Sequence, residues 1–204
     1  MGKLYFTIGL PRSSKTTKCN VWAQDYHTEI VGHQLIFNEL NNSNPRTIVC
    51  ADEIRLAVYG QRWWTEGEEL VHAIQRIMIV SLLNRHDVIV DGTHTTESSI
   101  RRLLDIDPEA DYLFVDTEAE VCRQRAINTD QKDLLPIIDR MEENLEGFQE
   151  RYLPPTEKMQ INCRVDHQTG KTVGCSNLLP LNEAISRGVE KIREDVQRRI
   201  KHIC

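Results

Sequence analysis

The chain of 204 residues has no long hydrophobic run, no closely spaced cysteine pair and no excess of positive charge. Its longest mostly apolar stretch, 77–83, is far shorter than the roughly 20 residues that cross a bilayer. The first ten residues lack the apolar core of a signal peptide. The six cysteines are scattered without a CxxC pair, which is typical of reduced thiols. We therefore expect a cytoplasmic protein without a membrane segment.

The net charge of −6 argues against a uniformly basic surface of the kind that binds nucleic acid nonspecifically. The charge is unevenly distributed, however. Residues 1–150 hold 15 Lys and Arg against 25 Asp and Glu, whereas residues 151–204 hold 10 against 6. The basic tail is compatible with a nucleic-acid contact confined to one surface, and equally with a solvated amphipathic helix.

Continuously apolar strands alternate with helices through most of the chain, which predicts an α/β fold with a mainly parallel central sheet covered on both faces, a three-layer α/β/α arrangement. We expect one domain over residues 1–153 and a small C-terminal extension over 154–204, with a hairpin near 160–175 and an amphipathic helix carrying the stripe Ile185 to Ile200. The expected strands are 4–8, 47–51, 88–91 and 112–116. The first expected helix starts at residue 15, and the others span 53–59, 66–83, 98–104, 119–127 and 134–150.

A phosphate-binding pattern follows the first expected strand. Residues 9–16, GLPRSSKT, fit G-x-x-x-x-G-K-[ST] except at Ser14. Backbone N–H groups at a helix start would contact phosphate, Lys15 would bind the β and γ phosphates, and Thr16 would supply a hydroxyl to Mg²⁺. The alternative is a chance strand–turn–helix with a surface lysine. The expected ATP-binding residues are Gly9, Pro11, Arg12, Ser13, Ser14, Lys15, Thr16 and Thr17.

Two aspartates end neighbouring apolar strands, where side chains of a parallel sheet line a ligand crevice. Asp91 is expected to hold Mg²⁺ through water; alternatively it caps the turn before Gly92. Asp52 is expected to accept the proton of a hydroxyl nucleophile, with Arg55 three residues further on. The alternative for this pair is a helix-capping aspartate with a solvent arginine.

Arg123 and Arg125 lie on an expected helix that follows the strand ending at Asp116. This position suits a lid that neutralises charge on a transferring phosphoryl group. The pattern of acidic and basic residues here is also that of an ordinary charged helix face.

Taken in order, these motifs make the first 150 or so residues resemble the P-loop kinase family of phage and bacterial polynucleotide 5′-kinases. The resemblance is carried by KLYFTIGLP at 3–11, ADEIR at 51–55, VDGTH at 90–94 followed by Arg101 and Arg102, and CRQR at 122–125. It implies an ATP- and Mg-dependent enzyme that phosphorylates a hydroxyl of DNA or RNA, with Asp52 as general base and Arg55 on the acceptor's phosphate. Ser14 and His94 depart from the family pattern. The tail resembles nothing we can place and contains no phosphatase-type DxDxT motif.

An aromatic pair follows the Asp52 motif. Trp63 or Trp64 could stack on a nucleobase with Arg62 near a phosphate; alternatively both tryptophans pack in the core. The expected acceptor-binding residues are Asp52, Arg55, Arg62, Trp63, Trp64, Thr93 and His94. Cys163, His167 and Cys175 fit no standard zinc spacing, so we assign no zinc site.

Three other functions stay open at this point. The acceptor could be a hydroxymethyl group on a modified base of phage DNA, such as 5-hydroxymethyluracil, which must leave its stack to react. It could also be a free nucleoside or another metabolite. The third alternative, suggested only by Ser14, is a nucleotide-binding module that has lost catalysis. The sequence indicates no particular oligomeric state.

Overall fold

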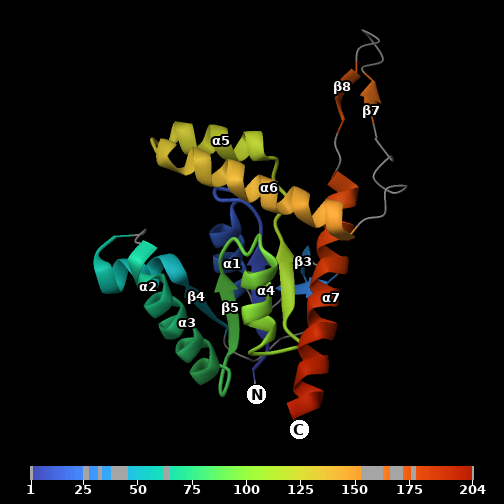
Figure 1. Cartoon of the computed structure of the whole chain (residues 1–204). Helices are drawn as coiled ribbons and strands as arrows, with labels where there is room; N and C mark the ends of the chain where they lie inside the picture. The colour runs from blue at the N-terminus through green and yellow to red at the C-terminus, as the bar shows by residue number, and fades with distance from the viewer. Residues whose placement is uncertain are drawn as a thin grey trace.

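The computed structural model describes residues 2–24, 28–31, 34–37, 46–61, 65–152, 163–165, 172–175 and 178–203. Four parallel strands form the central sheet in the order β4-β5-β1-β6. Helices cover both faces, so the predicted three-layer α/β/α fold around a parallel sheet is confirmed (Figure 1). The strands are β1 (Leu4–Ile8), β4 (Arg46–Cys50), β5 (Asp87–Asp91) and β6 (Asp111–Phe114).

The helices agree with the sequence expectation to within about two residues at most ends. One difference matters for the site: α2 begins at Ala51, so Asp52 lies in the first turn of that helix and not at the end of a strand. The helices are α1 (Lys15–Gln24), α2 (Ala51–Tyr59), η1 (Thr65–Gly67), α3 (Glu68–Leu82), α4 (Glu97–Leu104), α5 (Ala119–Asn128), η2 (Lys132–Leu134), α6 (Leu135–Tyr152) and α7 (Leu178–Ile203).

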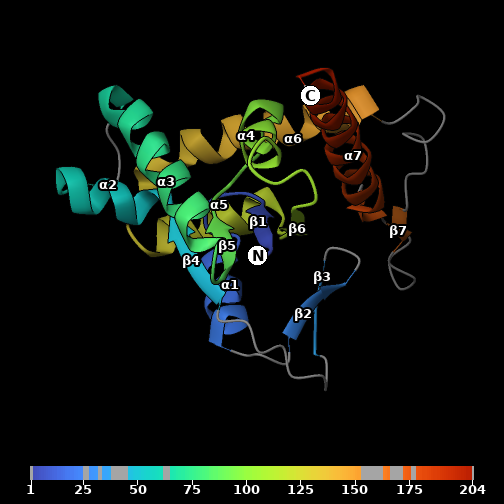
Figure 2. The ribbon, with the colours of Figure 1, turned by 90° about the horizontal axis from the view of Figure 1, so that it is seen from below.

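Two antiparallel hairpins stand apart from the central sheet. The hairpin of β7 (Cys163–Val165) and β8 (Thr172–Cys175) is the one expected in the tail. The hairpin of β2 (Thr28–Val31) and β3 (Gln34–Phe37) was not expected; it lies near β6 and is seen best in Figure 2.

The side chains of β1 show how the layers are held together. Leu4, Phe6 and Ile8 point to the face that α3, α4 and α7 cover, because alternate side chains of a strand point to opposite faces. Tyr5 points to the other face, where its ring meets that of Trp22 on α1 edge-on at 4.5 Å. Figure 2 shows α1 on one side of the sheet and α3, α4 and α7 on the other.

The C-terminal helix docks on its own protein. α7 packs against α4 and α6, and its apolar stripe is continuous with the main core. The stripe comprises Ala184, Ile185, Val189, Ile192 and Val196, all buried. The expected boundary at 153/154 lies outside the described residues. Across the described ranges, no helix is both long enough and apolar enough to pass through a bilayer.

The order of the strands determines where a ligand can bind. From β1 the chain continues to β4 and β5 on one side, and it then crosses to β6 on the other side. Ligands of open parallel sheets bind where the strand order reverses, beyond the carboxyl ends of the strands. That point is the loop after β1, which carries the predicted phosphate-binding residues.

Candidate active site

The loop after β1 begins at Gly9, where no other residue fits. Its φ of 151° is one that L-residues rarely adopt, and a Cβ there would lie 2.7 Å from the Val115 carbonyl oxygen. The Gly9 N–H donates to the Thr93 carbonyl (2.9 Å). The loop is therefore fixed between the chain that follows β5 and the chain that follows β6.

Ser14, the residue that departs from the loop pattern, has a left-handed backbone conformation. Ser14 has a φ of 73° and Arg12 a φ of 64°, both left-handed. Glycine adopts this conformation without a steric cost, which explains why the pattern has glycine at position 14. The fold holds Ser14 in the glycine-like conformation, and its hydroxyl accepts a hydrogen bond from Arg125 Nη1 (3.2 Å).

Lys15 begins α1 with its side chain turned back over the loop. Its Nζ donates to the Leu10 carbonyl (2.5 Å) and to Ser13 Oγ (3.3 Å). The residue is 7% exposed. Burial lowers the pKa of Lys15 to about 8, although the nearby charge of Asp91 acts in the opposite direction. A buried ammonium beside the first N–H groups of a helix is a strong attractor for phosphate.

Thr16 and Asp91 are brought together as predicted. Thr16 Oγ1 donates to Asp91 Oδ2 over 2.6 Å, and Asp91 is buried at the end of β5. A hydroxyl and a carboxylate fit Mg²⁺, which takes few protein ligands and completes its shell with water and phosphate oxygens. Within the described ranges, no cluster of three His, Cys, Asp or Glu side chains could hold a metal on its own.

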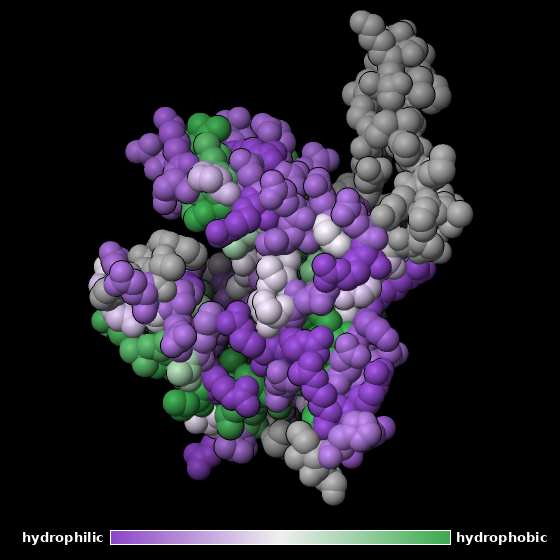
Figure 3. Space-filling model, in the orientation of Figure 1, coloured by the Kyte–Doolittle hydropathy of each residue, from purple (hydrophilic) through white to green (hydrophobic). Residues whose placement is uncertain are grey.

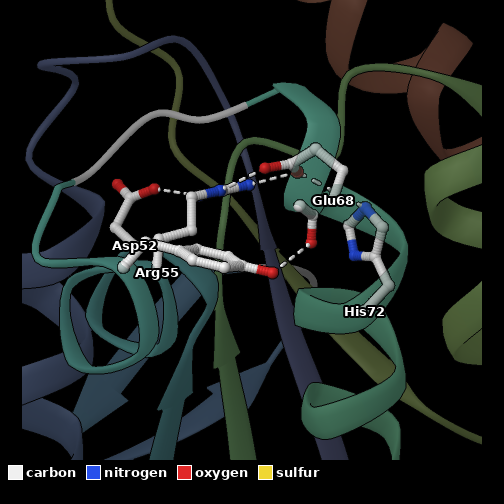
Figure 4. Close-up of polar contacts among 6 residues, drawn as sticks. Asp52, Arg55, Glu68 and His72 are labelled. Atoms are coloured by element: carbon white, nitrogen blue, oxygen red, sulfur yellow. Dashed lines mark hydrogen bonds and ion pairs between the residues drawn. The ribbon is translucent and has the colours of Figure 1, made fainter.

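A chain of ion pairs stands at the opposite wall of the site (Figure 4). Arg55 Nη1 donates to Asp52 Oδ1 (2.5 Å), and Arg55 Nε and Nη2 donate to the two carboxylate oxygens of Glu68 on α3 (2.6 Å each). The pairing holds the pKa of Glu68 below its usual value and raises that of Arg55. His72 stands one turn further along α3, with Nε2 3.8 Å from Glu68 Oε2.

Arg55 and Asp52 differ in the exposure of their side chains. The Arg55 side chain is 8% exposed and the Asp52 side chain 58% exposed. The Asp52 carboxylate is therefore accessible at the cleft, whereas Arg55 is buried and held by Glu68. Glu68 was not singled out from the sequence; its only local signal is an acidic residue in the first turn of a helix, which is common.

His94 lies near the loop, with Nδ1 2.7 Å from the Thr7 carbonyl oxygen. A carbonyl only accepts, so the ring hydrogen is on Nδ1 and Nε2 carries a lone pair. Burial lowers the pKa of His94 to about 4, which keeps the ring neutral. His94 also has a left-handed backbone with φ 41°.

The two predicted lid arginines on α5 have different surroundings. Arg125 Nη1 donates to the Arg12 carbonyl (3.0 Å) as well as to Ser14, and Arg12 Nη2 donates to Thr129 Oγ1 (3.0 Å). Arg123 instead pairs with Asp139 and Glu142 of α6. Of the two predicted lid arginines, Arg125 thus contacts the loop after β1, and Arg123 joins α5 to α6.

These groups open into one cleft of about 1400 Å³. Figure 3 shows a hollow in this face, between the α2–α3 arm and the α5–α6 pair. Single-ligand pockets usually measure about 300–1,000 Å³, so this cleft has room for a nucleotide and a second substrate. The predicted residues that line it are Pro11, Arg12, Ser14, Lys15, Thr16, Thr17, Asp52, Arg55, Asp91, Thr93, His94 and Arg125.

Part of the predicted acceptor site lies outside the described residues. This applies to Arg62, Trp63 and Trp64, and to His167 of the cysteine–histidine group. The side chains of Cys163 and Cys175 are likewise not described. The stacking role of the tryptophans stays a prediction.

Comparison with known proteins finds solved structures of similar fold. No family model matches the sequence, and no curated protein matches it. Among solved structures, a chain of the Pnkp1/Rnl/Hen1 RNA repair complex aligns with a TM-score of 0.50 and 18% identity over 72% of this chain and 46% of that one. A chain of another structure of the Pnkp1/Rnl/Hen1 complex aligns with a TM-score of 0.49 and 22% identity over 61% of this chain and 38% of that one. The chain thus spans less than half the length of these neighbours, and the likeness is one of fold.

Proposed function

We propose that the protein is an ATP-dependent kinase that transfers the γ-phosphoryl group to a hydroxyl of a nucleic acid, namely a polynucleotide 5′-hydroxyl. The observation that carries this proposal is a single cleft with a phosphate-binding loop on one wall and an exposed carboxylate, Asp52, on the other. The presence of a similar fold in an RNA repair complex supports a nucleic acid as the acceptor.

The proposed reaction uses each wall for one task. Asp52 accepts the proton of the acceptor hydroxyl while that oxygen forms a bond to the γ phosphorus. The bond from the γ phosphorus to the β–γ bridging oxygen breaks, and ADP leaves. Lys15 and Arg125 neutralise the charge that spreads over the transferring group. Arg55, fixed by Glu68, keeps the Asp52 carboxylate oriented toward the cleft.

Magnesium fits the other end of the cleft. Thr16 and Asp91 would hold the ion beside the loop, Asp91 through water, and the ion would neutralise charge on the β and γ phosphates. The direct Thr16–Asp91 hydrogen bond keeps both ligand groups in place for this role.

The proposal is tested by a transfer assay with γ-labelled ATP and three acceptors: a 5′-hydroxyl oligonucleotide, DNA that carries hydroxymethyl bases, and free nucleosides. We expect label on the oligonucleotide. Lys15→Ala and Asp52→Asn should each nearly abolish transfer, and Asp52→Asn should leave ATP binding intact. Asp105→Asn, an exposed carboxylate at the end of α4 outside the cleft, is the matched control and should keep full activity.

The outcomes separate the alternatives. Label on the modified base or on the nucleosides alone would replace the proposed acceptor. Transfer to none of the three would refute the proposed kinase function. Full turnover by Asp52→Asn would show that Asp52 is not the general base.

A further inference from the structure

Three arginines without an assigned role line the cleft that contains Asp52. Arg76 is on α3, Arg102 on α4 and Arg140 on α6, and all three line the cleft with exposed side chains. Among the contacts of the described residues, none of the three makes an ion pair or a side-chain hydrogen bond. Three separate helices thus present unpaired guanidinium groups to one space.

Exposed arginines without an ion pair also occur outside the cleft, as Arg85 does, but several arginines of the described residues are neutralised by acidic side chains. Arg55 is neutralised by Glu68, Arg123 by Asp139 and Glu142, and Arg151 by Glu97. Converging like charges repel one another and need a reason to persist. The natural reason for an unpaired arginine cluster in a cleft is an anionic ligand, because the guanidinium group binds phosphate with two hydrogen bonds.

The position of Arg102 connects the cluster to the proposed acceptor site. Arg102 lines the same cleft as His72 and His94, and its charge adds to burial in lowering the pKa of both rings. It also contributes to the lowered pKa of Glu68, which holds Arg55. Arg102 therefore belongs to the same cleft as the proposed acceptor site.

The spacing of residues along α3 gives the distance between the Asp52–Arg55–Glu68 group and Arg76. Glu68, His72 and Arg76 are four residues apart and share one face of α3, so Arg76 lies about 12 Å along the helix from Glu68, at roughly 1.5 Å per residue. At about 3.4 Å per nucleotide, this distance corresponds to several nucleotides of a strand.

We propose that Arg76, Arg102 and Arg140 form a track that binds the backbone phosphates of a single strand on the 3′ side of the reacting nucleotide. The inference rests on the proposed function, since Asp52 defines where the strand begins. The track makes the protein select a polynucleotide over a free nucleoside, and it places the acceptor's phosphate contacts on these three side chains and not on Arg55.

The test compares the wild type with the triple variant Arg76→Ala/Arg102→Ala/Arg140→Ala. Anisotropy of a labelled single-stranded 5′-hydroxyl oligonucleotide reports binding without ATP, and a salt series gives the number of phosphate contacts. We expect affinity to fall on the order of tenfold for each arginine removed. The slope of log affinity against log salt should shrink by about 0.7 per lost contact. In the transfer assay, KM for the oligonucleotide should rise while KM for ATP stays the same.

Two further variants keep the result interpretable. Arg85→Ala removes an exposed arginine outside the cleft and should bind the oligonucleotide as the wild type does. The triple Lys variant at the three positions keeps the charge and should retain the salt slope. Unchanged affinity and slope in the triple Ala variant would overturn the track. Because binding is measured without transfer, this result is separate from a failure of the wild type to phosphorylate any 5′-hydroxyl, which would overturn the proposed function instead.

Discussion

Replacement of the loop lysine should make the free protein more stable, although it removes a residue of the proposed catalytic site. Lys15 is 7% exposed, and burial lowers its pKa from 10.5 to about 8. This difference corresponds to about 3 kcal/mol of destabilisation whenever the lysine is charged. Lys15→Met fills a similar volume without the charge, but it loses the hydrogen bonds to Leu10 and Ser13, each worth about 1 kcal/mol.

The net expectation is a gain of roughly 1 kcal/mol, or about 2–4 °C in Tm for a chain of this size. The pH dependence identifies the cause. Below pH 8 the lysine is charged in both the folded and the unfolded state, and its full cost is present. Between about pH 8 and 10.5 the folded state releases the proton and the unfolded state keeps it, so the stability of the wild type rises relative to that of the variant. Because this rise of about 3 kcal/mol exceeds the initial difference of roughly 1 kcal/mol, the variant's advantage should close early in this window and then reverse.

Differential scanning calorimetry of both proteins from pH 7 to pH 10 measures the gap, and other titrating groups cancel in the comparison. Addition of ATP and Mg²⁺ at pH 7 should then raise the Tm of the wild type and leave that of Lys15→Met unchanged. A variant that is less stable than the wild type at pH 7, or a gap that stays constant with pH, would refute the idea that Lys15 is a buried charge held in place for a phosphate.

Two further predictions concern the loop and its lid. Gly9→Ala should lower the free energy of unfolding by about 2–4 kcal/mol, because its Cβ meets the Val115 carbonyl at a φ that alanine rarely adopts; urea denaturation measures this, and Gly147→Ala in α6, where a Cβ meets nothing within 4 Å, should be neutral or stabilising. Arg125→Ala should lower kcat in the transfer assay, whereas Arg123→Ala should cost at most about 1 kcal/mol of stability and leave kcat unchanged, since its partners are partly exposed acids of α6. Equal losses of kcat in the two variants would contradict the separation of their roles.

The central sheet was predictable because each of its strands is a continuous apolar run, and buried parallel strands have that pattern. The hairpin of β2 and β3 was not, since its strands are four residues long and carry no strong alternation. The start of α2 was also displaced, because Cys50 precedes the helix without a side-chain cap to mark the boundary. The sequence pattern of single segments thus predicted the central sheet, but it missed the short β2–β3 hairpin and the first residues of α2.

The residues of the candidate site likewise fall into those that local sequence predicts and those that only the fold brings together. Lys15, Thr16 and Asp91 could be predicted because a strand, a loop and a helix place them by local sequence alone. Glu68 could not, because its role comes from Arg55, 13 residues earlier on another helix. The proposed arginine track is harder still: Arg76 and Arg140 carry no local signal and Arg102 only a motif of unassigned role, and the three meet because separate helices bring them to one cleft.

This convergence also changes how the net charge is interpreted. The basic excess of the chain lies in its last 54 residues, where a nucleic-acid contact was one of two alternatives. On α7, however, four of the six Lys and Arg residues pair with acids of the same helix: Arg187 with Glu183, Lys191 with Glu194, Arg193 with Glu190 and Arg198 with Asp195. Such pairs are the mark of a solvated helix face. The unpaired arginines of the cleft belong to the acidic first 150 residues. A surface attracts a polyanion when its cations are not already paired with acidic side chains. Whether they are paired depends on the fold and not on the composition.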